Sequence, residues 1–280
     1  MVSQTPEDHY VKVGNVKTRY WASGNEGTVV ILIHGLGGFV ENWIYNINVL
    51  AQYHRVYALD LAGFGRSDKT SILSSLSQGA QFVHDFMTVQ NINRASLVGH
   101  SMGGGITLQY AIQFPDRIEK MVLVDSVGLG REMHLLVRLI SLPFIGEFLS
   151  RPSRKGTVQL LKTYIYDPTL ITDEFVELCY KMASLPGAQK CFLSCLRNGI
   201  NYRGIRTDLL RPIMDNLSNI MIPTLVIWGK QDKIFHFSHA YLAKERIPNV
   251  ELHVLDPCGH MPQIERPEDI NKLLLEFLAG

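Results

Sequence analysis

Short runs of apolar and β-branched residues recur along the chain, and stretches with helical spacing separate them. The run VVILI at residues 29–33 contains no polar side chain, as expected for a strand that is buried on both faces. Further runs of this kind occupy residues 55–59, 94–98, 120–124, 224–228 and 251–255. Strands that alternate with helices form a mainly parallel sheet, because each helix carries the chain back across a face of the sheet. The sequence therefore predicts an α/β fold.

Helices are expected in the intervals, where apolar residues recur at three- and four-residue spacing. The predicted helices cover approximately residues 42–51, 77–91, 102–113, 238–246 and 267–278. The start of the chain differs, because residues 9–13 and 15–21 have the pattern of an antiparallel hairpin turned at Gly14-Asn15. With this hairpin, the predicted sheet has eight strands flanked by helices.

The strand pattern stops between residues 129 and 217, where a helical pattern rich in large apolar side chains replaces it. Such a segment carries too much apolar surface to remain a solvated linker. We therefore predict a core domain formed by residues 1–128 and 218–280, with residues 129–217 inserted as a helical cap. Some apolar side chains of this segment are expected to pack mostly between cap and core, and a few to line an apolar pocket: Met133, Leu136, Phe144, Phe148 and Met182.

Charge and composition exclude several classes of protein. The formal net charge is +1 and the basic residues are dispersed, which argues against a nucleic-acid partner. The first ten residues have neither a basic start nor an apolar core, so no secretory signal is predicted, and no apolar run is long enough to span a membrane. Four cysteines in 280 residues do not form a disulfide framework. We expect a cytoplasmic protein that is a monomer or a homodimer.

The motif GHSMG at residues 99–103 follows one predicted strand and begins a predicted helix. A tight strand-to-helix turn pushes the Ser101 hydroxyl outward, and small residues two positions before and after the serine relieve the crowding. The free N–H groups at the start of the helix point toward developing negative charge. The pattern is weak when it stands alone, but the strand before it and the helix after it support a nucleophile at Ser101.

A glycine-rich run, HGLGG, occupies residues 34–38 directly after the strand at 29–33. Acyl transfer needs two N–H donors aimed at the carbonyl oxygen as it becomes an oxyanion. Met102, which follows Ser101, is expected to supply one of these backbone donors and Leu36 the other. A plain turn that ends the strand remains the alternative interpretation of this run.

Asp232 and His260 each lie just beyond a predicted strand, where open α/β sheets place their ligands. A single histidine in a loop usually lies on the surface. Here, however, a serine, an aspartate and a histidine follow one another in the order typical of one hydrolase fold. We therefore predict a triad of Ser101, Asp232 and His260. Asp125, at the end of the strand at 120–124, is the alternative acid.

Candidate pocket residues lie beside these motifs, namely His34, Gly35, His100 and Met261. His34 is also expected to brace the glycine-rich turn by a hydrogen bond. The glycine-rich runs lack the Lys-Ser/Thr ending of a phosphate-binding loop, and no His or Cys cluster completes a metal site. No cofactor and no metal are predicted.

These motifs resemble those of the α/β-hydrolase superfamily, and the similarity covers nearly the whole chain. The run DLAGFGRS at residues 60–67 is similar to the family's D-x-x-G-x-G-x-S turn, and residues 129–217 correspond to its helical cap. The resemblance implies hydrolysis through an acyl-enzyme, in which Ser101 attacks, His260 transfers the proton and Asp232 orients the imidazole. Asp60 and Arg66 are expected to stabilise the turn.

The cap stretch YDPTLITDE at residues 166–174 resembles the meta-cleavage-product hydrolases, which cut carbon–carbon bonds in vinylogous diketo acids. The chain departs from that subfamily at three positions, with Cys179 in place of an arginine, His100 in place of an asparagine and Met261 in place of a tryptophan. We therefore favour a carboxylesterase-type serine hydrolase acting on small-molecule esters of small to medium acyl chain. The alternatives are a carbon–carbon bond hydrolase, a cofactor-free perhydrolase and a non-catalytic binding protein.

Overall fold

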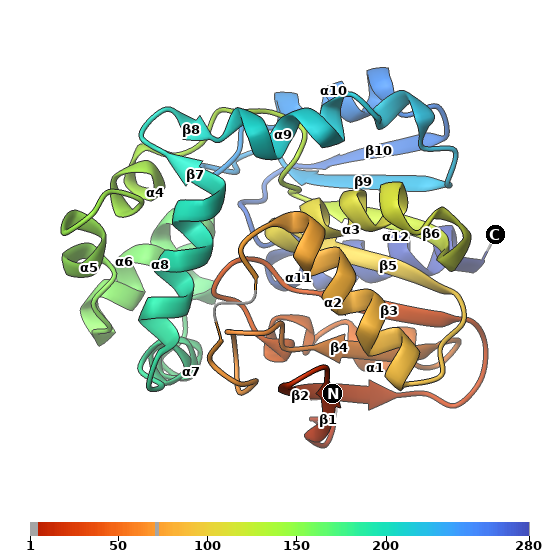
Figure 1. Cartoon of the computed structure of the whole chain (residues 1–280), viewed down its shortest axis with the longest axis horizontal. Coiled ribbons are helices and arrows are strands. Elements are labelled where there is room, and N and C mark those ends of the chain that lie inside the picture. The colour runs from red at the N-terminus through yellow and green to blue at the C-terminus, as the bar shows by residue number, and fades with distance from the viewer. Residues whose placement is uncertain (1–4, 71–72, 280) are drawn as a thin grey trace.

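Eight strands form a mainly parallel sheet in the computed structural model, which describes residues 5–70 and 73–279 (Figure 1). The strand order is β1-β2-β4-β3-β5-β6-β9-β10. The hairpin strands β1 and β2 are antiparallel, β2 is antiparallel to β4, and the remaining neighbours are parallel. The predicted α/β class with an eight-stranded, mainly parallel sheet is confirmed.

The strands agree with the predicted runs to within one or two residues at either end. Their bounds are β1 (His9–Val13), β2 (Val16–Ser23), β3 (Val29–Ile33), β4 (Arg55–Leu59), β5 (Ala95–His100), β6 (Ile118–Val124), β9 (Thr224–Gly229) and β10 (Val250–Leu255). All five residues of β3 are buried. Ile31 and Ile33 belong to one apolar cluster, while Val30 and Leu32 belong to another, so both faces of the sheet are covered. This double burial is why VVILI contains no polar residue.

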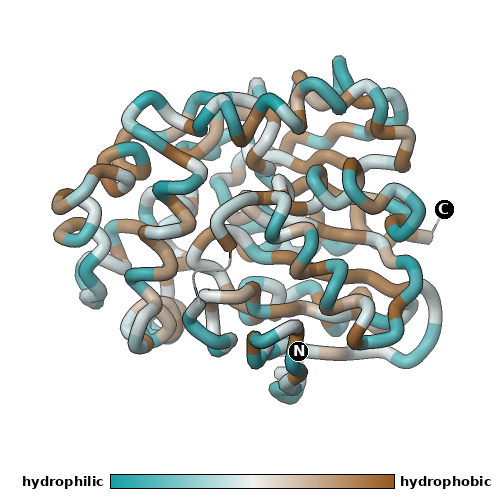
Figure 2. The backbone as a smooth tube through the Cα atoms, in the orientation of Figure 1, coloured by the Kyte–Doolittle hydropathy of each residue, from teal (hydrophilic) through white to brown (hydrophobic). Residues whose placement is uncertain are grey.

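Helices cover both faces of the sheet, and the central strands form the most apolar part of the backbone (Figure 2). One face packs against α2 (Leu76–Val89), α3 (Met102–Gln113) and α10 (Ser238–Arg246); the other packs against α1 (Ile47–Leu50) and α12 (Pro267–Ala279). Short helices complete the core: η1 (Val40–Trp43), η2 (Pro115–Arg117), η4 (Leu217–Asn219) and α11 (Pro262–Glu265).

The single helix predicted for residues 42–51 is wrong, because η1 and α1 divide that segment. Between η1 and α1 the backbone bonds are of the tighter i→i−3 type, because the Ile44 N–H donates to the Glu41 carbonyl at 3.2 Å and the Asn46 N–H donates to the Trp43 carbonyl at 2.9 Å. Asn42 Oδ1 accepts the Phe39 N–H at 3.0 Å, and the Asn46 amide donates to Asn271 Oδ1 at 2.9 Å.

Between β6 and β9 the chain is mostly helical, as expected. The elements are α4 (Leu135–Ile140), α5 (Ile145–Leu149), α6 (Arg154–Tyr164), η3 (Pro168–Leu170), α7 (Asp173–Ala183), α8 (Ala188–Gly199), β7 (Ile200–Asn201), β8 (Gly204–Ile205) and α9 (Thr207–Met214). The sequence did not predict the small β7–β8 hairpin. In Figure 1 helices α4 to α8 gather beyond the carboxyl ends of the parallel strands.

Two aromatic residues of this segment are not core residues, contrary to the prediction. Phe144 is 87 % exposed and Phe148 is 79 % exposed. The helix α5 has only five residues, and its buried position is Gly146. Phe144 and Phe148 lie four residues apart on the same outer face of the turn, so they are exposed together. The other three predicted positions are partly or fully buried, namely Met133, Leu136 and Met182.

The turn at residues 60–67 is built on a buried ion pair rather than on catalytic groups. The Asp60 side chain is fully buried and accepts the Val40 and Arg66 backbone N–H groups, each at 2.7 Å. The Arg19 guanidinium, 1 % exposed, lies 3.3 Å from Asp60 and 2.8 Å from Glu41. Burial raises the pKa of Asp60 to about 6, and the charge of Arg19 opposes that rise. Asp60 therefore holds the turn in place.

Replacing Asp60 by alanine is expected to lower the free energy of unfolding by ~3–5 kcal/mol, because the Val40 and Arg66 N–H groups lose their acceptor and the buried Arg19 loses one of its three carboxylate partners. Urea denaturation of both proteins measures the difference. Asp208→Ala is the control, because Asp208 forms an exposed pair with Arg206 and its loss should hardly change the midpoint. Equal midpoints for Asp60→Ala and the wild type would contradict the structural role.

The sequence predicted no membrane-spanning segment. Within residues 5–70 and 73–279, no helix has both the length and the apolar character needed to cross a bilayer. Residues 1–4, which begin the stretch inspected for a secretory signal, lie outside the described residues.

Candidate active site

Ser101 occupies a strained turn between β5 and α3. Its φ is +54° and its ψ is −116°, a region that residues with a side chain rarely adopt. The Ser101 N–H donates to the Val124 carbonyl at 2.8 Å, which fixes the turn against β6. A Cβ on Gly99 would lie 2.2 Å from the Gly103 carbonyl oxygen, and a Cβ on Gly103 would lie 2.3 Å from that of Ile33. The glycines of the GHSMG motif are therefore required by close backbone contacts.

The structure brings Ser101, His260 and Asp232 together as one hydrogen-bonded chain. His260 Nε2 lies 3.1 Å from Ser101 Oγ, and His260 Nδ1 lies 2.8 Å from Asp232 Oδ2. The other oxygen, Asp232 Oδ1, accepts the backbone N–H groups of Ile234 and Phe235 at 2.7 and 3.1 Å. Because a carboxylate can only accept, Nδ1 carries the proton and Nε2 is free to accept one from the serine. Ser101, Asp232 and His260 are all buried.

Two backbone contacts hold the histidine loop. The His260 N–H donates to the carbonyl of Tyr164 at 2.7 Å, which ties the loop to α6. The His100 side chain donates from Nε2 to the His260 carbonyl at 2.7 Å. Burial and the neighbouring His260 hold the pKa of His100 well below its usual range, so His100 is a neutral donor.

Glu265, which no sequence motif indicated, supports the same loop. Its carboxylate accepts the N–H groups of Gly259 and Met261, which flank His260, at 3.1 Å each. It also accepts the Tyr166 N–H at 2.7 Å, so it joins the histidine loop to the segment after α6. Burial raises the pKa of Glu265 above its usual value. The available signal was an acidic residue at the end of the mostly apolar run MPQIE directly after the histidine.

Glu265→Ala is expected to lower kcat by between about 10- and 100-fold with a smaller change in KM, because three N–H groups lose their acceptor and His260 shifts. Glu265→Gln keeps one acceptor oxygen and should recover part of the loss. Steady-state kinetics on one ester measure both parameters. Glu268→Ala, at an exposed position of α12, is the control, and an unchanged kcat in Glu265→Ala would contradict this role.

The two predicted oxyanion donors lie beside the serine. Leu36 is in a β-turn closed by a hydrogen bond from the Gly38 N–H to the Gly35 carbonyl at 3.0 Å, and Gly37 has a φ of +74°. Met102 is the first residue of α3, so its N–H has no acceptor within that helix. Leu36 and Met102 line the same pocket as Ser101.

His34 does not line the pocket, contrary to the prediction. Its side chain is fully buried behind the turn, where Nε2 accepts the Leu61 N–H at 3.0 Å and Nδ1 donates to the Gly35 carbonyl at 2.7 Å. Burial lowers the pKa of His34 to about 4, so the ring is neutral and can make both contacts. His34 therefore braces the turn, which was its second predicted role. Gly35, His100 and Met261 do line the pocket.

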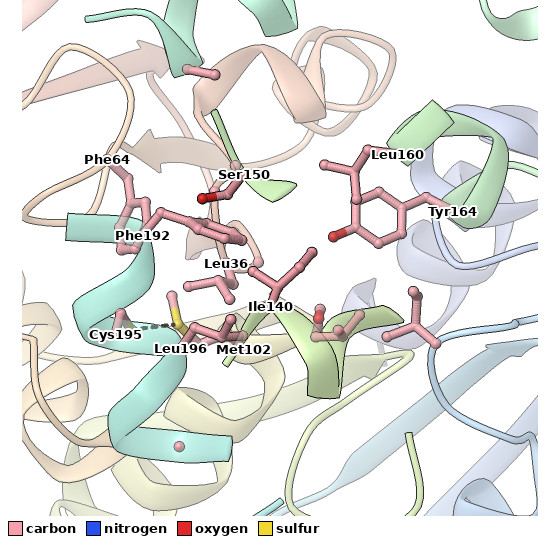
Figure 3. Close-up of a pocket in the computed structure, with 18 of the residues that line it drawn as sticks. Leu36, Phe64, Met102, Ile140, Ser150, Leu160, Tyr164, Phe192, Cys195 and Leu196 are labelled. Atoms are coloured by element: carbon pink, nitrogen blue, oxygen red, sulfur yellow. Dashed lines mark hydrogen bonds between the residues drawn. The ribbon is translucent and has the colours of Figure 1, made fainter. Parts of the chain in front are cut away.

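The pocket above Ser101 has a volume of about 430 Å³, and its wall is mostly apolar. Figure 3 shows Leu36 and Met102 grouped with lining side chains from α4, α6 and α8: Ile140, Leu160, Tyr164, Phe192, Cys195 and Leu196. The hydroxyl of Tyr164 points toward the centre. Burial raises the pKa of Tyr164 to about 12, so it is a neutral phenol that can donate a hydrogen bond.

The cationic side chains on the pocket wall are either hydrogen-bonded to backbone carbonyls or exposed to solvent. Lys69 Nζ donates to the carbonyls of Gly65 and Ser67 at 2.6 and 2.7 Å, and Arg151 is exposed. Cys179 also lines the pocket, and burial raises the pKa of its thiol to about 12. Among the described residues, the interior of the pocket therefore presents no free cation to a substrate carboxylate.

One cluster of metal-binding side-chain types occurs in the described part of the chain. Ligand atoms of Asp125, Asp232 and His260 lie within 4.8 Å of one another, and all three residues are buried. However, Asp232 and His260 are bonded to each other, and His260 is also bonded to Ser101. This arrangement favours a proton relay over a metal site.

Several known proteins are similar to this chain over nearly its whole length. A 2-hydroxy-6-oxo-6-(2'-aminophenyl)hexa-2,4-dienoic acid hydrolase of Metapseudomonas resinovorans is 31 % identical over 97 % of this chain and 91 % of its own length. The structure of a meta-cleavage product hydrolase from Pseudomonas fluorescens has a TM-score of 0.83 at 29 % identity, over 97 % of each chain. A bacterial membrane phospholipase A has a TM-score of 0.85 at 26 % identity, over 98 % of this chain and 86 % of its own.

A family model matches most of the length of this protein. The match runs over residues 30–273 and thus includes the serine turn, the aspartate and histidine loops and the helical segment between β6 and β9. This match and the similarity to the hydrolases above confirm the resemblance inferred from the motifs. The chain belongs to the alpha/beta hydrolase family.

Proposed function

We propose that this protein is a serine hydrolase that cleaves carboxylic esters of small to medium acyl chain through an acyl-enzyme on Ser101. The single observation that carries the proposal is the chain of hydrogen bonds from Ser101 through His260 to Asp232 beside an apolar pocket. Residues 129–217 act in this proposal as a cap that shields the reaction from bulk water.

In the acylation step, Ser101 Oγ attacks the ester carbonyl carbon and gives its proton to His260 Nε2, which lies 3.1 Å away. Asp232 stabilises the resulting imidazolium through Nδ1–H. The carbonyl oxygen becomes an oxyanion, and the backbone N–H groups of Leu36 and Met102 are the proposed donors to it. The C–O bond then breaks, and His260 returns the proton to the departing alkoxide.

In the deacylation step, a water molecule takes the place of the alcohol. His260 accepts a proton from this water as the water oxygen attacks the acyl carbon, and the same two N–H groups stabilise the second oxyanion. When the C–O bond to Ser101 breaks, His260 returns the proton to Ser101 Oγ and the carboxylic acid leaves. The cycle needs only the ester, water and the residues of this chain.

The charge of the pocket supports an ester over a carbon–carbon substrate. A vinylogous diketo acid brings a carboxylate, and a buried carboxylate needs a cation or several donors. At the position where the resemblance leads us to expect an arginine, this chain has the neutral thiol of Cys179. The similarity to meta-cleavage product hydrolases nevertheless makes carbon–carbon bond hydrolysis the second candidate.

A panel of p-nitrophenyl esters from acetate to decanoate, assayed beside one meta-cleavage dienoate, tests the proposal. We expect the highest kcat/KM for intermediate acyl chains, because a cavity of about 430 Å³ gains apolar contact with each added methylene until it is filled. Turnover of the dienoate should be much slower. A dienoate kcat/KM above that of every ester would favour the second candidate.

Cys179→Arg is the matched variant for this comparison, because it places a cation on the pocket wall. Cys179→Arg should raise the turnover of the dienoate and lower that of the apolar esters, while Cys179→Ser should change neither turnover.

All four cysteines of the chain are free thiols, which supports the proposed cytoplasmic location.

A further inference from the structure

A second carboxyl group lies behind the triad and has no role in the mechanism above. Asp125 follows β6, is fully buried, and has a φ of +43°, where residues with a side chain are strained. Its Oδ1 accepts the Gly229 N–H at 3.0 Å. Its Oδ2 is also buried but has no donor among the described residues. A strained, buried acid with one unsatisfied oxygen lowers the stability of the folded protein, so a functional reason for its position is expected.

The neighbour of Asp125 is the proposed triad acid. An oxygen of Asp125, an oxygen of Asp232 and a ring nitrogen of His260 all lie within 4.8 Å of one another. Negative charges on both carboxyl groups would repel each other strongly, because water is excluded from this site. This repulsion favours the state in which one of the two keeps a proton.

The two carboxyl groups differ in the number of hydrogen-bond donors that face them. Asp232 accepts from two backbone N–H groups and from His260 Nδ1, so three donors face its oxygens. Asp125 has a single donor, from Gly229. Burial and the charge of Asp232 raise the pKa of Asp125 well above its usual range, and the charge of Glu265 adds to this effect. The adjacent Cys258 thiol is neutral, because burial raises its pKa.

We propose that Asp125 is a positioning residue that remains a neutral carboxylic acid and donates its proton in a hydrogen bond to the Asp232 carboxylate. The inference rests on the proposed function, since it assigns a partner to the triad acid. A proton on Oδ2 gives the unsatisfied oxygen a partner and removes the repulsion between the two acids. The bond also holds Asp232 against His260 and withdraws some negative charge from it, so that the imidazolium releases its proton more readily.

Two variants of Asp125 separate this role from a purely structural one. Asp125→Asn keeps an oxygen for the Gly229 N–H and an amide N–H for Asp232, and asparagine tolerates the positive φ. Asp125→Gly removes both groups and also fits the backbone, so it should fold. The readouts are the pH dependence of kcat/KM on an ester and the infrared difference spectrum between the wild type and Asp125→Asn at neutral pH.

We expect the difference spectrum to contain the C=O stretch of a protonated carboxylic acid in the wild type only. Asp125→Gly should lower kcat/KM about 10-fold. It should also raise, by about one pH unit, the midpoint of the increase of kcat/KM with pH, because Asp232 then attracts the proton on His260 more strongly. Asp125→Asn is the conservative variant, and it should restore both the rate and the midpoint.

Two results would overturn the proposal. A fall of the midpoint in Asp125→Asn, without the protonated-acid band in the wild type, would mean that Asp125 is ionised. An unchanged pH profile in Asp125→Gly would mean that the carboxyl group does not act on the triad. The infrared measurement needs no turnover, so it tests the protonation of Asp125 even if the protein cleaves no ester.

Discussion

Replacing Ser101 by alanine is expected to lower kcat for p-nitrophenyl butyrate by about four orders of magnitude or more, while the protein remains folded. The substitution removes the Oγ that lies 3.1 Å from His260 Nε2, and with it the atom that would form the acyl-enzyme. It keeps the Cβ, so the packing of the turn between β5 and α3 changes little. Initial rates measure the loss, and a thermal melt followed by circular dichroism checks the fold.

The control for this variant is Ser77→Ala. Ser77 is a partly exposed residue of α2 whose Oγ accepts a hydrogen bond from Gln113, and its loss should leave the rate unchanged. A serine-directed phosphonate should label the wild type and Ser77→Ala but not Ser101→Ala. Wild-type turnover in Ser101→Ala would show that the nucleophile has been assigned wrongly.

Asp232→Asn is expected to reduce kcat/KM by about 10⁴-fold near neutral pH. The reason lies in the two backbone donors to Oδ1, from Ile234 and Phe235, which force the remaining oxygen of an asparagine to occupy that side. Its NH₂ group then faces His260 Nδ1, which must become the acceptor. The ring is left with its proton on Nε2, so it cannot take the proton of Ser101.

Asp256→Asn is the matched control, because Asp256 is an exposed acid paired with Lys230 in a neighbouring loop. It should retain the activity of the wild type. The comparison with the Asp125 variants also decides between the two acids that the sequence left open. Near-normal activity in Asp232→Asn together with a complete loss in Asp125→Asn would make Asp125 the triad acid.

Much of the fold could be predicted from the sequence because the sheet is buried on both faces. Full burial requires runs such as VVILI, and these runs identify the parallel strands with little ambiguity. The serine turn was equally visible, since contacts of 2.2 and 2.3 Å leave no room for a side chain at Gly99 or Gly103. Where local spacing was the only signal, as at residues 42–51, the prediction failed because the backbone there changes to i→i−3 hydrogen bonds and forms two short helices.

Residues that act through distant partners could not be predicted in the same way. Glu265 braces the histidine loop only because the fold brings the backbone of Tyr166 to it. His34 carries a donor and an acceptor, and only the position of Leu61 directs it away from the pocket. Phe144 and Phe148 had the pattern of core residues, but the short helix α5 turns both of them outward.

The sequence by itself determined the α/β class, the order of the strands along the chain and the three residues of the proposed triad, because strand burial and tight turns restrict which residue types can occur locally. The tertiary structure alone decided which acid contacts His260, since Asp125 and Asp232 both lie beyond strand ends and differ only in their partners in space. It also decided the charge of the pocket wall. Hydrogen bonding and protonation depend on distances between segments far apart in the chain, and local residue patterns do not encode those distances.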